Sequence, residues 1–211
     1  MIVAIDGPAG AGKSTVAKRL AHALGIDYLD TGAMYRAVTF GVMQRDIDVA
    51  DETAVVSALS TMSIDVSDTV MVDGVDATLA IRGPEVTAAV SAVAANPRVR
   101  ESLVALQRAW VVKHGGGVVE GRDISTVVFP DADVKLFITA SPRVRAERRV
   151  AESGGDVDEV ARLIEERDRR DSTRAASPLS VASDATVVDT SGLSLDEVLA
   201  EVLELVDGVS S

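Results

Sequence analysis

A glycine-rich segment near the N-terminus combines a lysine and a serine at a fixed spacing, Gly7-Pro8-Ala9-Gly10-Ala11-Gly12-Lys13-Ser14. It follows an apolar run, Ile2–Ile5, and precedes a helical pattern. Glycines let a backbone curl until successive N–H groups point at phosphate oxygens, and the positive N-terminal end of the next helix faces the same spot. Lys13 can then reach the β- and γ-phosphates, and the Ser14 hydroxyl can bind Mg²⁺. The spacing predicts a nucleoside triphosphate site; an ordinary strand-to-helix turn is the alternative.

Composition limits the remaining possibilities. The 211 residues allow one or two domains, and the sequence contains no unbroken apolar run of the roughly 20 residues that span a membrane. The absence of cysteine excludes disulfides and thiolate metal sites. A first strand that begins at Ile2 leaves no room for a signal peptide, so we expect a cytoplasmic protein. The net charge of −12 argues against a nucleic-acid polymer as partner, and an anionic ligand therefore needs a local group of basic residues.

The segments that follow must position such basic residues. Helices are predicted over about 14–24 and from about 31 to 45, with a short strand over 26–29 between them. Asp30 or Thr31 can cap the second helix, and Tyr35 and Arg36 lie in its first turn. A cation there opposes the helix dipole, which points to an anionic partner, although an ordinary surface arginine is equally consistent.

A change of period marks an insert after a short helix over about 51–59. Strands are predicted over 63–66, 69–72 and 75–81, with a hairpin turn at Asp73-Gly74. Helices then begin at Pro84 and at Pro97. Ser91 and Arg100 on these helices could face a ligand, but each taken alone is more typical of a surface position.

The second half of the chain brings further charged residues to strand ends. A strand over 118–121 ends at Arg122-Asp123, where side chains of a parallel α/β sheet face the ligand crevice. Further strands are predicted over 133–139 and 185–188. A final helix over about 195–206 starts with the capping box of Ser194 and Glu197 and ends at Gly208.

Between residues 143 and 174 lie nine arginines and nine acidic residues. Two exposed helices laced by i,i+4 pairs would explain this composition. The break at Ser153-Gly154-Gly155 supports another interpretation, an arginine-bearing helical hairpin that closes over phosphates as a lid.

Taken together, these motifs resemble the nucleoside monophosphate kinases, and among them the bacterial cytidylate kinases. The matching segments are residues 7–15, Asp30-Thr31-Gly32-Ala33-Met34-Tyr35-Arg36, Asn96-Pro97-Arg98-Val99-Arg100, Gly121-Arg122-Asp123, Glu166-Arg167-Asp168-Arg169-Arg170-Asp171 and Arg174-Ala175-Ala176-Ser177-Pro178-Leu179. The resemblance covers nearly the whole chain. It implies a P-loop α/β core with a parallel central sheet, a small β-rich insert that binds the nucleoside monophosphate, and a short helical lid. It also implies phosphoryl transfer from ATP, with Mg²⁺, to CMP or dCMP.

The resemblance also assigns roles to individual residues. ATP would be bound by Gly7, Pro8, Ala9, Gly10, Ala11, Gly12, Lys13, Ser14 and Thr15, with Ser14 on the metal. Asp30 belongs to the acceptor motif, and the CMP phosphate would be held by Thr31, Tyr35, Arg36 and Arg122. Cytosine would be read by Ser91, Arg100 and Asp123, while Asp171 and Arg174 would contact the ribose side. Arg148, Arg167 and Arg170 would be lid or hinge arginines near the ATP phosphates, and with Lys13 and Arg122 they form the expected catalytic group.

The predicted organisation is a core over 1–61, 97–147 and 166–211, the insert over 62–96 and the lid over 148–165. We expect nucleotides as the only partners, no membrane, and a monomer. A kinase of another small acceptor, such as a different nucleotide or shikimate, is the second interpretation. A non-catalytic nucleotide-gated module is the third, although it would not need so many separate anion-binding arginines. A GTPase-type switch should carry an Asn-Lys-x-Asp motif, and the sequence has none.

Overall fold

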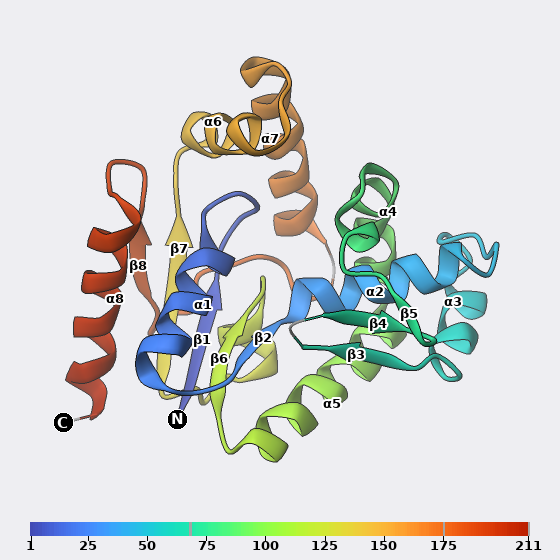
Figure 1. Ribbon diagram of the computed structural model, residues 1–211, viewed down its shortest axis with the longest axis horizontal. Coiled ribbons are helices and arrows are strands. Elements are labelled where there is room, and N and C mark those ends of the chain that lie inside the picture. The colour runs from blue at the N-terminus through green and yellow to red at the C-terminus, as the bar shows by residue number, and fades with distance from the viewer. Residues whose placement is uncertain (68, 175, 211) are drawn as a thin grey trace. The chain divides into compact units, whose positions relative to one another are not determined.

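The computed structural model describes residues 1–67, 69–174 and 176–210. The described chain folds as two compact units, one made of Met1–Tyr28 with Val111–Ser211 and the other of Leu29–Trp110. Ala175, which belongs to one of the motifs discussed above, lies outside the described residues. Figure 1 labels the elements of both units along the chain.

A five-stranded sheet organises the first unit, with the strand order β2-β6-β1-β7-β8. Its strands are β1 (Ile2–Asp6), β2 (Tyr28–Asp30), of which Tyr28 alone belongs to the first unit, β6 (Gly117–Glu120), β7 (Val134–Thr139) and β8 (Thr186–Asp189). The pairings of β1 with β6, of β1 with β7 and of β7 with β8 are all parallel. The four residues of β6 are buried, as expected of a central strand covered on both faces.

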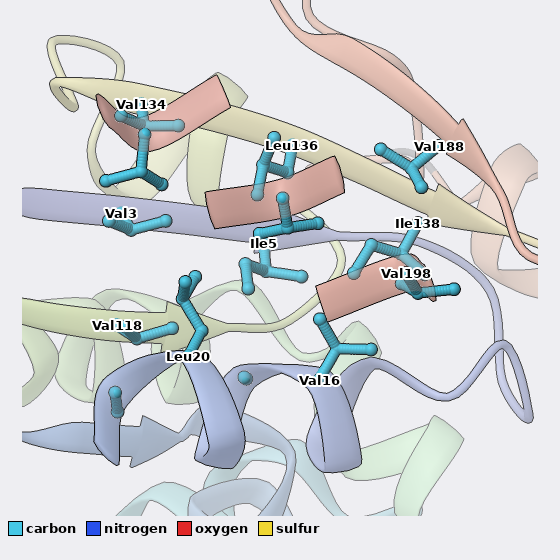
Figure 2. Close-up of a cluster of buried hydrophobic side chains, with 14 of the residues drawn as sticks. Val3, Ile5, Val16, Leu20, Val118, Val134, Leu136, Ile138, Val188 and Val198 are labelled. Atoms are coloured by element: carbon cyan, nitrogen blue, oxygen red, sulfur yellow. The ribbon is translucent and has the colours of Figure 1, made fainter. Parts of the chain in front are cut away.

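Two helices cover one face of this sheet, α1 (Lys13–Leu24) and α8 (Leu195–Ser210) (Figure 1). Their apolar stripes meet alternate residues of the strands in one core cluster, in which Val16 and Leu20 of α1 and Val198 of α8 pack with Ile5 and Leu136 (Figure 2). This packing fixes the start of α1 against the end of β1. The loop between them is therefore anchored at both ends.

Two further helices of the first unit are α6 (Pro142–Ser153) and α7 (Val157–Thr173). Ser141 caps α6 by accepting from the N–H of Val144, and Asp156 caps α7 by accepting from the N–H of Glu159. A π-helical turn, η2 (Ile124–Val128), follows the end of β6.

The second unit is built around α2 (Thr31–Met43), which packs on a small antiparallel sheet. That sheet contains β3 (Ile64–Val66), β4 (Val70–Val72) and β5 (Val75–Asp76) in this order. The helices α3 (Glu52–Leu59) and α4 (Pro84–Ala95) and the first residues of α5 (Pro97–His114) complete the unit. Asp73 and Gly74 both have positive φ, 50° and 81°, which confirms the predicted hairpin turn.

Most elements appear where the periodicity predicts them, with ends that shift by one or two residues. The strand expected over 75–81 is wrong beyond Asp76, because Thr78 uses its hydroxyl to accept from the N–H of Val70 and its own N–H bonds to Asp76. The chain then forms a 3-10 turn, η1 (Ala80–Arg82). The predicted stop at Gly208 is also wrong, because α8 continues to Ser210. In the described part of the chain, no helix has both the length and the apolar character required to cross a bilayer.

Candidate functional site

The loop between β1 and α1 has the backbone that the glycine pattern predicts. Gly7 has a φ of +146°, and a Cβ atom there would lie 1.9 Å from the carbonyl oxygen of Ile138. No other residue fits this close approach to β7. Gly12 is the N-cap of α1 in the left-handed conformation, with φ 89°. Because glycine brings no capping side chain, the first N–H groups of α1 are left for an anion.

Two carbonyl groups on the outside of this loop are engaged by protein side chains. The carbonyl of Ala9 accepts from Nη1 of Arg145 at 3.1 Å. The Thr190 hydroxyl lies 3.3 Å from the carbonyl oxygen of Ala11. The described chain has no cis peptide bonds, and the N–H of a trans peptide points opposite to its C=O. The N–H groups of Gly10 and Gly12 are therefore directed to the other side of the loop, where a phosphate would be bound.

Lys13 is folded back on the loop that it follows. Its Nζ donates to the carbonyl of Pro8 at 2.8 Å, and the residue is only 7% exposed. Burial and, to a lesser extent, the nearby Arg122 guanidinium lower the pKa of Lys13, and Glu120 and Asp6 act in the opposite direction; the net result is a pKa of about 7. A phosphate ligand would supply the negative charge that this ammonium lacks in the free protein.

The last residue of β1, Asp6, is completely buried and ties the loop to a second segment. Its carboxylate accepts from the backbone N–H of Ile124 at 2.8 Å and of Ser125 at 2.7 Å, and from the Ser125 hydroxyl at 2.5 Å. Burial raises the pKa of Asp6, an effect that these hydrogen bonds oppose. Asp6 thereby anchors the turn that directly follows Arg122 and Asp123.

Four predicted site residues of the first unit form two pairs at this turn. Nε of Arg122 lies 3.0 Å from a carboxylate oxygen of Asp171 on α7, and both side chains are largely buried. Nη2 of Arg174 lies 3.7 Å from Oδ1 of Asp123. The structure thus brings together residues that are 49 and 51 positions apart in the sequence. It also places the side chain of Arg122 close enough to Lys13 for their charges to interact.

The three predicted lid arginines have different surroundings. Arg148 donates to the hydroxyl of Thr190 at 3.0 Å and to its carbonyl at 2.7 Å. Burial lowers the pKa of Arg167, and in the described part of the chain its Nε has no hydrogen-bond partner. Arg170 is half exposed and pairs with Glu166 one turn earlier on α7. Of the three, Arg167 is the arginine whose donor group stands ready for an anionic ligand.

The acceptor motif of the second unit begins at the N-terminus of α2. Asp30 caps the helix by accepting from the N–H of Ala33 at 2.8 Å, and it pairs with Arg82 at 3.1 Å. Thr31 is buried. Nη1 of Arg36 donates to the carbonyl of Ile81 at 3.0 Å and to the Thr87 hydroxyl at 2.8 Å.

These contacts hold the Arg36 guanidinium beside η1 and α4. The arginine that the helix dipole disfavours is therefore a positioned side chain rather than a mobile surface group.

Tyr35 and Arg100, predicted from separate motifs, meet within the second unit. The guanidinium carbon of Arg100 lies 5.5 Å from the centroid of the Tyr35 ring, a cation–π contact. Arg100 is 4% exposed and donates to the carbonyl of Ala94 at 3.3 Å. Ser91 lies on α4 and is half-buried.

The described residues contain no cluster of three or more His, Cys, Asp or Glu side chains that could hold a metal ion by themselves. A divalent cation at the glycine loop would therefore take most of its ligands from the bound phosphates and water, as Mg²⁺ commonly does. Ser14, in the first turn of α1, supplies a hydroxyl at the place where those phosphates are expected.

Sequence reasoning missed several residues that shape this site. Asp6, Arg145 and Thr190 belong to no predicted motif, whereas Asp168 lies in the segment 166–171 but was given no role, and the partners of all four are distant in sequence. One signal was available, because Arg145 and Arg148 are three residues apart and must share a face of α6. That spacing could have distinguished Arg145 and Arg148, which contact the protein interior, from the exposed arginines of residues 143–174.

Comparison with known proteins finds relatives that match nearly the whole chain. The family model described as cytidylate kinase matches residues 3–208. The chain is 50% identical to a cytidylate kinase of Corynebacterium efficiens and 52% identical to one of Corynebacterium glutamicum, each over 98% of this chain and 94% of the relative. A crystal structure of a shikimate kinase from Bacteroides thetaiotaomicron, 14% identical, covers 98% of both chains with a TM-score of 0.51. At that identity the shikimate kinase shares the fold alone.

Proposed function

The chain belongs to the cytidylate kinase family, and from this premise we propose how its residues carry out the reaction. The reaction is transfer of the γ-phosphoryl group of ATP to CMP or dCMP, which gives ADP and CDP or dCDP. The observation that carries this assignment is about 50% identity to curated cytidylate kinases over nearly the full length. The glycine loop with Lys13 supplies an independent physical reason for the donor half of the reaction.

On the donor side, residues 7–15 bind the phosphates of ATP. The support is the loop geometry, in which outward carbonyls leave the N–H groups of Gly10 and Gly12 facing the opposite side. Lys13 exchanges the Pro8 carbonyl for a phosphate oxygen and offsets charge on the group in transfer. Phosphoryl transfer depends on such alignment and charge neutralisation more than on covalent chemistry, which is why no general base is needed for an acceptor that is already anionic.

Mg²⁺ accompanies ATP, and Ser14 is its protein ligand. When bound, the ion would neutralise part of the negative charge of the phosphates. The support is the place of Ser14 in the first turn of α1, directly after Lys13.

On the acceptor side, Thr31, Tyr35, Arg36 and Arg122 hold the phosphate of CMP. Arg36 is positioned by Ile81 and Thr87, so little side-chain entropy is lost when it binds an anion. Arg122 is paired with Asp171, and its guanidinium can turn part of its donor set to a phosphate while Asp171 keeps Nε.

Cytosine is recognised by hydrogen bonds of defined direction. Arg100 donates to N3 and O2 of the base, Asp123 accepts from the exocyclic amine, and the Ser91 hydroxyl assists. Uracil reverses the donor and acceptor pattern at N3 and at the neighbouring exocyclic group, so it leaves these side chains mismatched. Asp171 and Arg174 contact the ribose side.

Closure completes the site. Arg148, Arg167 and Arg170 lie near the ATP phosphates when the segment 148–165 closes as a lid, and closure excludes water that would otherwise hydrolyse ATP. The free Nε of Arg167 supports this role most directly. We further propose that the protein works in the cytoplasm as a monomer.

A panel of acceptors tests the assignment. The purified chain is supplied with MgATP and, in separate reactions, CMP, dCMP, UMP, AMP, GMP or shikimate, and ADP formation is measured. CMP and dCMP should be good acceptors, UMP poor, and AMP, GMP and shikimate negligible. AMP or UMP used as readily as CMP would reject the proposed base recognition, and a preference for shikimate would reject the nucleotide acceptor altogether.

A further inference from the structure

One buried guanidinium joins three parts of the first unit. Arg145, on α6, is 4% exposed. Its Nε donates to the carbonyl of Ala140 at the end of β7 at 2.9 Å, and its Nη1 donates to the carbonyl of Ala9 in the glycine loop at 3.1 Å. The same Nη1 lies 2.6 Å from a carboxylate oxygen of Asp168 on α7. Of these residues, Ala9 alone belongs to the predicted ATP-binding set.

The bond to Ala9 bears directly on phosphate binding. A trans peptide fixes the N–H of Gly10 opposite to the carbonyl of Ala9. Arg145 therefore orients one of the donors that the loop offers to ATP. The fit is close, because a Cβ atom on Gly10 would lie 3.3 Å from Cβ of Arg145.

The bond to Asp168 connects this arginine to the acceptor residue Arg122. Asp168 and Asp171 are three residues apart on α7 and so lie on the same face of that helix. Asp168 binds Arg145, and Asp171 binds Arg122 at 3.0 Å. One face of α7 is thus connected through Arg145 to the glycine loop. The same face is connected through Arg122 to the turn that follows β6.

A second pair between α6 and α7 provides an internal contrast. Arg143 lies 3.2 Å from a carboxylate oxygen of Asp158, and their side chains are 69% and 83% exposed, against 4% and 22% for Arg145 and Asp168. Arg143 is otherwise paired with Glu147 on its own helix. The two pairs join the same helices, but only the buried one reaches the loop.

We propose that Arg145 is a positioning residue for the phosphate loop and that Asp168 makes this positioning depend on α7, so that the acceptor and ATP bind cooperatively. When the acceptor phosphate takes over part of the Arg122 donor set, the hold of Asp171 on Arg122 changes and α7 adjusts. Asp168 passes that adjustment to Arg145 and hence to the Ala9–Gly10 peptide. This coupling rests on the proposed role of Arg122, whereas the positioning of the loop does not.

The affinity for ATP measures the first part of the proposal. The dissociation constant of MgATP is determined by calorimetry for the wild type, Asp168→Asn and Asp158→Asn. Asp168→Asn keeps the shape but removes the charge that holds Arg145, and we expect binding to weaken about tenfold. Asp158→Asn, the matched control on the same helix, should bind MgATP as the wild type does. Equal affinities of all three folded proteins would overturn the positioning role.

A double variant guards against misfolding, because Asp168→Asn leaves a buried charge without its partner. Arg145→Met combined with Asp168→Asn removes both charges and keeps the volume. We expect this protein to fold and still to bind MgATP about tenfold more weakly than the wild type. Normal affinity in the folded double variant would show that the pair stabilises the fold alone.

Cooperativity measures the second part. In the wild type, saturating CMP should improve the affinity for a non-hydrolysable analogue of MgATP, which prevents turnover, at least about fivefold, and CMP binding should improve by the same factor when the analogue is present. Asp168→Asn should bring the factor close to one, and Asp158→Asn should leave it unchanged. An unchanged factor in Asp168→Asn would overturn the coupling. If CMP does not bind at all, the proposed acceptor is wrong, but the MgATP measurements still decide the role of Arg145.

Discussion

The charged residues of the first unit fall into two regions of different character. Around the glycine loop they are buried and paired in networks, as in Arg145 with Asp168 and Arg122 with Asp171. On α6 and the first turn of α7 they are exposed and paired loosely, as in Arg143 with Asp158 and Arg149 with Glu152. Both regions contain arginine–carboxylate pairs at hydrogen-bonding or near hydrogen-bonding distance. The pairs of the two regions differ in how far their side chains are exposed to water.

That difference decides what each pair contributes. An exposed ion pair is screened and typically adds about 0–1 kcal/mol to stability. Breaking a buried pair strands a charge without water and costs several times more. The buried region can therefore fix the geometry of a reaction site, while the exposed region is free to move. The arginine-rich segment 143–174 contains ion pairs of both kinds, the buried and the exposed.

We expect the largest effect on activity from a change of Lys13, the buried cation that follows the glycine loop. Lys13→Ala should lower kcat by about 10²–10³-fold, because a positioned cation at the transferring phosphate is lost. The fold should persist, since the variant removes a charge from a buried position. Steady-state kinetics with MgATP and CMP, together with a circular dichroism spectrum, check both statements. Turnover within a few-fold of the wild type would remove Lys13 from the mechanism.

The next effect separates the two regions by stability. Asp171→Ala leaves Arg122 without its carboxylate and should lower the free energy of unfolding by about 2–3 kcal/mol. Asp158→Ala, on the exposed side of the same helix, should change it by about 0.5 kcal/mol or less. Urea denaturation of both variants beside the wild type gives the comparison. Equal losses would mean that burial does not distinguish the two regions.

The uptake of a proton when MgATP binds should distinguish Lys13 from the exposed lysines and arginines. Its pKa is lowered to about 7 in the free protein, so many of the molecules lack the ammonium near neutral pH. Phosphate binds the ammonium form and raises this pKa, so MgATP affinity should fall as pH rises above 7, by up to about tenfold per unit.

Calorimetry at pH 8 in buffers of different ionisation enthalpy should detect uptake of nearly one proton per ATP bound, and Lys13→Met should abolish that uptake. By the same linkage, the unfolded chain holds more protons than the native one between about pH 7 and the ordinary lysine value of 10.5, so the contribution of Lys13 to stability improves as pH rises through that window. Uptake of no proton by the wild type would contradict the lowered pKa.

The smallest effect concerns motion in the exposed region. Gly154 and Gly155 have φ of +73° and +113° and separate two arginine-bearing helices. Residues from about Arg148 to Leu163 should exchange their amide hydrogens rapidly in the free protein and several-fold more slowly with a bisubstrate analogue bound. The segment around Asp6 should stay protected in both states. Equal protection of residues 148–163 in the two states would exclude a lid there.

What the sequence could predict is local in the chain. The glycine loop is contiguous, and each of its residues has a conformational or chemical reason to be there, so its geometry follows from the spacing of Gly7, Gly12 and Lys13. The capping box of Ser194 and Glu197 is equally local, and it forms as expected. Asp73-Gly74 turns the chain for the same reason.

What the sequence could not predict depends on contacts between distant segments. Asp6 bonds to Ser125 across 119 positions, and Arg145 bonds to Ala9 across 136. No periodicity or spacing rule links such residues, since their meeting is set by the parallel order of β6, β1 and β7. The strand expected to reach Ile81 failed for a related reason, because the Thr78 hydroxyl takes part in a bond to Val70 that ends the ladder.

The most direct test of the account measures where the γ-phosphoryl group goes. The wild type is given limiting MgATP and excess CMP, and ADP and CDP are quantified in the same reaction by anion-exchange chromatography. The positioned site, with Lys13, Arg122 and a closing lid, predicts one CDP for each ADP, with negligible hydrolysis. ADP formed without an equal amount of CDP would contradict the account, because the group would then be passing to water rather than to the phosphate of CMP.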